Sequence, residues 1–441
     1  MPGFFDDIIG AMQTSDKEGI VLTPQQLLDQ QFGLPLRHFA QQYLFGATGL
    51  RIGVFHSISG IPQSCKSPLL FDLMGHVAAS PDLGGLGGLG VLYEMEGKIS
   101  PVLLNSILKQ YGPDAVAHVN VVKARTINVA FNHFSKVLIK NCHEKANYGI
   151  PIIAGFDSIG GSGSDDTLKK VQADGAVGKG FYDKAHFLKY FCENAGALIG
   201  DLPMVIVCVN QEKEKVASNP YGPQPKEMAK ITGGVSQIYK DGWMVHADYG
   251  KLNSGMGKLI TLRTLKTSFS DDRKIQVAFT WNAVGTDLND AYNHHFDWAT
   301  ATADVIANHE PVGSIRDVCN VSVAQESGRV TCPTLGLRSV TPEEFEAALF
   351  AEENRAVLDG LYTYLKIDKI KSISEYAEFM KTRKAGAKNK GKEAEKAAEP
   401  NEPAPEPAAK KPAKKRTVKK PAPAVAPFEG PVLDEEVPSE S

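Results

Sequence analysis

Residues 59–67 constrain this chain more than any other stretch, and they read S-G-I-P-Q-S-C-K-S. An apolar, strand-like run comes directly before them, and apolar residues at helical spacing come after them. A strand, a turn of this kind and a helix form a cradle for phosphate groups, with the pattern G-x-x-x-x-G-K-[ST]. Gly60, Lys66 and Ser67 fit this pattern, whereas Cys65 takes the place of the second glycine. The stretch therefore predicts a phosphate-binding loop between a strand and a helix.

The expected chemistry of the loop depends on its backbone and on two side chains. Loop N–H groups and the positive end of the following helix would face the phosphates. Lys66 would reach the β- and γ-phosphates, and the hydroxyl of Ser67 would hold Mg²⁺. An ordinary Gly/Ser turn with an exposed lysine is the alternative reading. The residues expected to bind the nucleotide are Gly60, Ile61, Pro62, Gln63, Ser64, Cys65, Lys66 and Ser67.

Composition bounds the class of protein. The 441 residues carry a net charge of −3, so a nucleic-acid surface would have to be local. Six scattered cysteines without a C-x-x-C pair argue against zinc and for a reducing compartment. No apolar run is long enough to span a membrane, and Asp6 and Asp7 stand where a secretory signal would be apolar. We therefore expect a cytoplasmic protein that does not use a membrane as a partner.

Three further apolar runs end in polar side chains. The run at 91–97 contains Glu96, the run at 149–158 reaches Asp157, and the run at 204–211 ends at Gln211. In open α/β sheets, chemistry lies at the carboxyl ends of strands. Glu96 is then placed to polarise a water beside a γ-phosphate, Asp157 to support Mg²⁺ through Ser67, and Gln211 to sense the γ-phosphate. Each can equally be an ordinary polar residue at a strand end.

Two long open stretches, 160–183 and 212–230, come directly after the second and third of these runs. Their lysines could neutralise phosphates and a tyrosine could stack on bases, which suits a groove for single-stranded DNA. Because both stretches also contain acids, a pair of solvated loops is the alternative. The residues expected to contact DNA are Lys169, Lys170, Lys179, Lys213, Lys215, Tyr221, Lys226, Lys230, Gly233 and Gly234.

The rest of the chain divides by composition and pattern. Alternating runs between 243 and 281 predict a β-meander, in which Arg263 and Lys266 either face solvent or reach a phosphate on an adjacent subunit. We expect an N-terminal segment at 1–34 that packs on the rest of the chain or on a neighbouring subunit, a core at 35–285 and a small helical C-terminal domain at 286–380. The tail at 381–441 is rich in Lys, Ala, Pro and Glu and is expected to be disordered.

In this order, the motifs resemble the ATPase core of RecA-type recombinases over roughly residues 35–285. The Glu94-x-Glu96 pair and the C-K-S ending of the loop most resemble the UvsX-type recombinases of large bacteriophages. The resemblance implies a RecA-like P-loop core, a mostly parallel twisted α/β sheet flanked by helices with a β-meander. It also implies that ATP and Mg²⁺ bind, that Glu96 is the general base, and that Gln211 reports the γ-phosphate to the second loop.

The same resemblance implies an assembly and a function. Residues 1–30 would dock on the next protomer, giving a helical filament on single-stranded DNA that pairs with homologous double-stranded DNA. Lys266 and Arg263 would reach the neighbour's ATP and stabilise developing charge. Mediator and single-stranded DNA-binding proteins would be further partners in the bacterial host's cytoplasm. Two alternatives stay open: a RecA-fold hexameric helicase, and a nucleotide-switched DNA-binding filament protein without turnover.

Overall fold

The chain separates by its internal contacts into residues 1–385 and 386–441. A computed structural model describes most of the first unit. None of the helices found there is long and apolar enough to cross a membrane. The described residues are 31–145, 149–160, 163, 189, 191, 193–194, 196–200, 202–213, 230–231, 241–252, 256–267, 273–282, 293–308 and 315–382.

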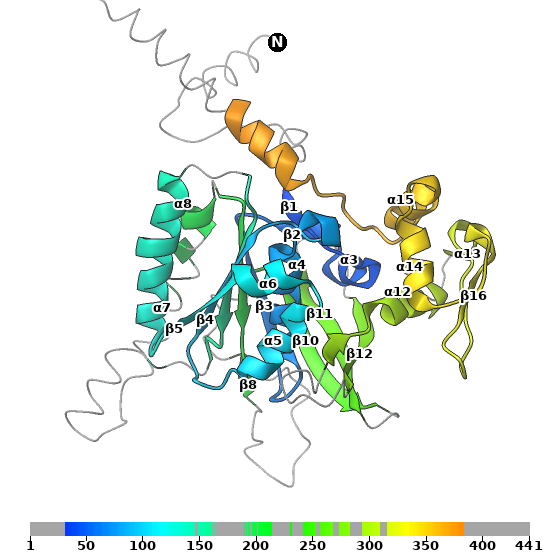
Figure 1. Cartoon of the computed structure of the whole chain (residues 1–441), viewed down its shortest axis with the longest axis horizontal. Coiled ribbons are helices and arrows are strands. Elements are labelled where there is room, and N and C mark those ends of the chain that lie inside the picture. Colours follow the sequence, from blue (N-terminus) through cyan, green and yellow to red (C-terminus); the bar gives the residue numbers. More distant parts are fainter. Residues whose placement is uncertain are drawn as a thin grey trace, which may run out of the picture. The chain divides into compact units, whose positions relative to one another are not determined.

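One large sheet organises the fold (Figure 1). Its nine strands are β3 (Phe55–Gly60), β4 (Leu89–Glu94), β5 (Val119–Lys123), β6 (Ile152–Asp157), β7 (Met204–Val209), β10 (Asp241–Lys251), β11 (Gly257–Thr267), β12 (Lys274–Asn282) and β13 (Asn293–Phe296). Their order is β13-β12-β11-β10-β3-β7-β6-β4-β5. The strands from β10 to β5 pair in parallel, and those from β10 to β13 pair antiparallel. The expected mostly parallel α/β sheet with a meander is thus present.

Helices cover both faces of the parallel part, as the strand sequences require. Successive residues of a strand point to opposite faces, so a strand covered on both sides is apolar throughout. In β7, Val205 and Val207 pack in the core with α4 and α5, whereas Ile206 packs in the opposite core with α7. The helices of this part are α4 (Lys66–Ala78), α5 (Pro101–Lys109), α6 (Pro113–His118), α7 (Ile127–His133), the π-helical stretch η2 (Phe134–Ile139) and α8 (Lys140–Glu144). A 3-10 turn, η1 (Pro81–Leu83), follows α4.

Short elements precede the sheet and branch from it. The pair β1 (Gly33–Pro35) and β2 (Gly49–Arg51) flanks α3 (Phe39–Phe45), and the pair β8 (Glu212–Lys213) and β9 (Lys230–Ile231) lies beyond β7. The caps of two helices agree with their sequences. Ser100 accepts a hydrogen bond from the N–H of Leu103 at the start of α5, where Pro101 follows the cap. Thr341 and Glu344 form a reciprocal capping box later in the chain.

The segment after residue 285 is not wholly helical, which corrects the sequence-based expectation. Its helices are α12 (Trp298–Asn308), α13 (Ile315–Val318), α14 (Pro342–Phe350), α15 (Arg355–Tyr364) and a helix at 373–382, with 3-10 turns η3 (Pro333–Leu335) and η4 (Glu352–Asn354). However, β13 belongs to the large sheet, and β14 (Ser322–Val323), β15 (Val330–Cys332) and β16 (Leu337–Val340) form a small antiparallel sheet. Strands of two to four residues are too short for an alternating pattern to reveal them.

A buried arginine joins this C-terminal segment to the large sheet. Arg273, beside β12, donates to the carbonyl oxygen of Tyr43 at 2.6 Å and to those of Leu365 and Lys366 at 2.7 and 2.8 Å. Its guanidinium also lies 4.9 Å from the centre of the Tyr43 ring. Because a planar guanidinium offers several donors in a rigid fork, one side chain can bind three carbonyl oxygens on two backbone segments. The C-terminal segment is therefore attached to the antiparallel side of the sheet.

Candidate active site

The predicted phosphate-binding loop connects β3 to α4, and its backbone departs from ordinary geometry. Gln63 and Cys65 have positive φ angles of 66° and 57°. The left-handed region costs a non-glycine residue about 1 to 2 kcal/mol. Cys65 thus adopts the backbone conformation that a glycine would adopt without cost. Burial raises the pKa of its thiol to about 11, against the charges of Lys258 and Lys66, so it is a neutral thiol.

Gly60 is required at the start of the loop for a different reason. It ends β3 with φ at 147°, and a Cβ atom there would lie 2.1 Å from the carbonyl oxygen of Ala247 on β10. A side chain would separate these two neighbouring strands. The first glycine of the pattern therefore serves the packing of strand against strand.

Lys66, the first residue of α4, points its ammonium group back into the loop. Nζ donates to the carbonyl oxygen of Ile61 at 2.5 Å and lies 3.3 Å from Oγ of Ser64. Burial lowers the pKa of Lys66, and the negative charges of Asp157, Glu212 and Glu96 oppose that shift. Both of these hydrogen-bond acceptors are neutral oxygens. The buried ammonium could therefore exchange one of them for the charged oxygen of an anion.

Ser67 and Asp157 form the second part of the site. Asp157 ends β6, is only 8% exposed, and accepts a hydrogen bond from the Ser67 side chain. Burial raises the pKa of Asp157 to about 6, as does the nearby charge of Glu96, while Ser67 and Lys66 act in the opposite direction. Hard cations such as Mg²⁺ take oxygen ligands, and their charge would favour the ionised carboxylate. This hydroxyl and carboxylate therefore fit Mg²⁺ in the presence of a nucleotide.

Glu96 lies just beyond β4 and is held by groups from three strand ends. Nε2 of Gln211 donates to its two carboxylate oxygens at 3.0 and 3.3 Å. Nζ of Lys98 lies 3.1 Å from Oε2, and the hydroxyl of Ser158 donates to Oε1. The sequence-predicted base and the sequence-predicted sensor are thus in direct contact. This network fixes the orientation of a carboxylate that lines the same cavity as the loop.

The residue after Gln211 is tied to the sheet as well. Oε1 of Glu212 lies 2.7 Å from Nδ1 of His246 on β10. Burial raises the pKa of Glu212, but the contact with His246 and the positive charge of Lys66 outweigh burial, so its pKa lies below the usual range. The start of the predicted second DNA-binding loop is therefore anchored beside the phosphate-binding loop.

These groups line one cavity of about 550 Å³ at the carboxyl edge of the parallel strands. Cavities of roughly 300–1,000 Å³ are typical of small-molecule and cofactor sites. The sequence-predicted residues that line it are Pro62, Gln63, Ser64, Cys65, Lys66, Ser67, Glu96, Asp157 and Gln211. Ile61 contributes its carbonyl oxygen to Lys66. A single site therefore collects residues from the loop and from the ends of three different strands.

Other sequence-predicted residues do not line this cavity. Arg263 is exposed on β11 opposite His246, and Lys266 lies further along β11 opposite Met244, where only its backbone is described. Their expected role on a neighbouring subunit's nucleotide stays a prediction. Lys213 and Lys230 face each other in the β8–β9 pair, again as backbone alone. The remaining predicted DNA contacts, Lys169, Lys170, Lys179, Lys215, Tyr221, Lys226, Gly233 and Gly234, lie outside the described residues.

Sequence reasoning missed one wall of the cavity. That wall comes from the antiparallel part of the sheet and consists of Lys258, Phe279, Trp281 and His294. The side chains of Phe279 and His294 stack with ring centroids 6.1 Å apart. The alternation within 274–281 does place Phe279 and Trp281 on one face, but only the strand order shows that this face borders the loop.

Neither protein-family models nor curated proteins gave a match to this chain. Among the described residues, no cluster of three or more His, Cys, Asp or Glu side chains could hold a metal ion by itself. The function must therefore be inferred from the geometry of the cavity.

Proposed function

We propose that this chain is an ATP-dependent DNA recombinase with a RecA-like core. It would form helical filaments on single-stranded DNA and promote homologous pairing and strand exchange. The observation that carries the proposal is the convergence of three groups on one cavity: the buried ammonium of Lys66, the Ser67–Asp157 pair and the Glu96–Gln211 pair. Phosphoryl transfer needs a cation, a magnesium site and a group that orients water, and these residue types could supply all three.

Each group has a task in the hydrolysis of ATP to ADP and phosphate. Lys66 would exchange its bond to the Ile61 carbonyl for a phosphate oxygen. Mg²⁺, held by Ser67 and supported by Asp157, would neutralise phosphate charge when bound. The carboxylate of Glu96 would orient the attacking water and accept its proton. Because Gln211 already donates to Glu96, a phosphate that recruits the amide would change that contact.

The topology supports a link between nucleotide and DNA. The two stretches expected to contact DNA follow β6 and β7, which are neighbours in the sheet. Asp157 ends the first strand, and Gln211 lies two residues beyond the end of the second. A change at the γ-phosphate would therefore act at the starting points of both stretches, without a long path through the protein.

A second candidate function is a DNA-binding filament protein that binds nucleotide without turnover. It is favoured by the engagement of Lys66 and Glu96 with protein groups, since both would have to leave these partners for catalysis. In this case nucleotide binding would still change the Glu96–Gln211 contact, but phosphate would not be released.

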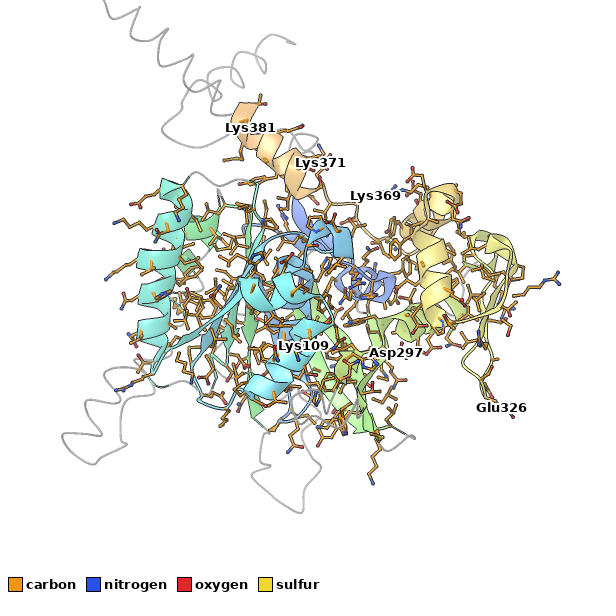
Figure 2. The ribbon with its side chains drawn as sticks, viewed as in Figure 1. Lys109, Asp297, Glu326, Lys369, Lys371 and Lys381 are labelled. Atoms are coloured by element: carbon orange, nitrogen blue, oxygen red, sulfur yellow. The ribbon has the colours of Figure 1, made fainter. Side chains whose placement is uncertain are left out.

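The deciding experiment measures phosphate release from ATP with and without single-stranded DNA, for wild type and Glu96→Gln. We expect DNA to stimulate release, and the substitution to lower it by about 100-fold or more, because an amide cannot act as a base. ATP-dependent DNA binding should survive the substitution. Glu326→Gln is the matched control, since Glu326 is exposed and lies at the tip of the loop between β14 and β15 (Figure 2).

The remaining outcomes separate the candidates. Wild type that releases no phosphate, yet binds DNA more tightly with ATP, supports the nucleotide-switched protein. An enzyme that keeps its rate with Gln at position 96 contradicts the assigned base. Joint-molecule formation between coated single strands and a homologous duplex then tests strand exchange, and electron microscopy distinguishes filaments from the rings of a helicase.

A further inference from the structure

Lys258, near the start of β11, lines the cavity. Its Nζ donates to the carbonyl oxygen of Gln63 in the phosphate-binding loop at 2.8 Å. The same atom lies 4.5 Å from the centre of the Tyr249 ring on β10. A cation over an aromatic face is attracted by the ring, so Tyr249 restricts where the ammonium group can lie. Lys258 is therefore directed toward the loop.

Lys258 and Lys66 make the same kind of contact with the loop. Lys66 donates to the carbonyl of Ile61, and Lys258 donates to the carbonyl of Gln63, two residues further on. Both ammonium groups thus bond to neutral oxygens of the loop that would border a bound phosphate chain. A phosphate oxygen carries negative charge, so it attracts an ammonium group more strongly than a neutral carbonyl oxygen does. A phosphate chain in the cavity would therefore compete for both lysines.

The charges of the cavity favour the same role. The described residues lining it carry three carboxylates, those of Glu94, Glu96 and Asp157, and three lysines, Lys66, Lys98 and Lys258. Lys98 is already paired with Glu96 at 3.1 Å. Without Lys258 the lining would carry a net negative charge, which would oppose the entry of a triphosphate.

We infer that Lys258 is a second phosphate-binding cation, supplied by the same chain, which holds the loop through Gln63 before nucleotide binds and then pairs with the phosphate chain. This inference rests on the proposed function and extends it to the β10–β11 hairpin. It differs from the role expected for Arg263 and Lys266, which would act on the nucleotide of a neighbouring subunit.

The test measures the dissociation constants of ATP and AMP with Mg²⁺ by calorimetry on the full chain. Lys258→Gln keeps an N–H donor for the Gln63 carbonyl but removes the charge. It should weaken ATP binding about tenfold and AMP binding less, because AMP carries fewer phosphate charges. Lys258→Arg should bind ATP within about threefold of wild type, since it keeps the charge.

Lys251→Gln is the matched control. Lys251 is exposed, faces Lys258 in the β10–β11 register and does not line the cavity, so its removal takes the same charge from the same hairpin. ATP affinity should be unchanged in this variant. Thermal unfolding of every variant shows whether the fold is intact.

Three results would overturn the inference. Unchanged ATP affinity in Lys258→Gln, while Lys66→Ala abolishes binding, would reject Lys258 and leave the proposed function standing. Equal weakening of ATP and AMP would show that the substitution distorts the loop. Wild type that binds neither nucleotide would reject the proposed function, and the inference with it.

Discussion

One buried carboxylate lies within helix α4 and another lies beside it, and the two differ in their surroundings. Asp72, in the middle of α4, accepts hydrogen bonds from Tyr111 at 2.6 Å, Trp298 at 2.9 Å and Gln41 at 3.2 Å. Asp157, beside the first turn of α4, accepts from Ser67 and shares a cavity with the carboxylate of Glu96. Their exposures are similar, at 3% and 8%.

The difference shows how burial alone fails to distinguish a structural acid from a functional one. Burial raises the pKa of both carboxyl groups. At Asp72 the three donors come from segments that are distant in the sequence. The carboxylate therefore links these segments to α4 and has a structural role. At Asp157 the neighbouring carboxylate of Glu96 adds electrostatic repulsion. The negative charge of Asp157 is therefore available to bind a cation that enters with a ligand.

Asp72→Ala should have the largest effect on the fold. Alanine removes both acceptor oxygens and leaves the donors of Tyr111, Trp298 and Gln41 without their partner in a buried space. We expect the free energy of unfolding to fall by about 3 to 4 kcal/mol, measured by urea denaturation at neutral pH. Nucleotide affinity of the folded protein should stay unchanged.

Asp82→Ala provides the control for Asp72→Ala. Asp82 is exposed in the turn after α4, so its substitution should change the unfolding free energy by no more than about 0.5 kcal/mol. A loss of similar size in both variants would mean that the three donors around Asp72 contribute little.

Asp157→Asn should change stability in the opposite direction. The pKa of Asp157 is about 6 in the folded chain, against an ordinary value of 3.8. The folded state therefore binds the proton more tightly, and stability is lost as pH rises from 3.8 through 6. Removing the ionisable group should stabilise the protein by roughly 2 to 3 kcal/mol above that window in the absence of Mg²⁺.

The pH dependence separates this explanation from a general packing effect. At about pH 4 Asp157 of folded wild type is almost fully protonated and therefore uncharged. The gain in unfolding free energy from Asp157→Asn should then fall below about 1 kcal/mol. Urea denaturation in acid and at neutral pH measures the difference. A gain that is the same under both conditions would show that ionisation is not its cause. The variant should also lose magnesium-dependent ATP binding.

The sequence alone was sufficient to predict the residues on one side of the cavity. The loop, Glu96, Asp157 and Gln211 each follow an apolar run, and parallel strands bring such ends to one edge of a sheet. Even without knowledge of the strand order, these residues could be assigned to one site. Their position around one cavity follows from this common arrangement of parallel strand ends.

The other side required the strand order itself. Lys258, Trp281 and His294 reach the cavity because β10 pairs with β3, which brings the antiparallel strands beside the loop. Nothing local to these residues marks them, since a lysine near a strand end is usually solvated. The same holds for Asp72, whose partners Gln41 and Trp298 lie 31 and 226 positions away. Contacts of this kind depend on tertiary packing, which the periodicity of apolar residues in the sequence does not reveal.

Cys65→Gly should have the smallest effect. Cys65 precedes α4 at the end nearest Asp157, and its left-handed backbone conformation has no counterpart around Asp72 in the middle of the helix. Glycine removes the cost of the left-handed conformation, about 1 to 2 kcal/mol, but adds about 0.5 to 1 kcal/mol of unfolded-state entropy. A net stabilisation below about 1 kcal/mol is expected in urea denaturation. Cys65→Ala keeps a Cβ atom and so should show no gain. If Cys65→Gly instead destabilises the protein by more than Cys65→Ala does, the loop is held by its neighbours without strain, and the missing glycine costs the chain nothing.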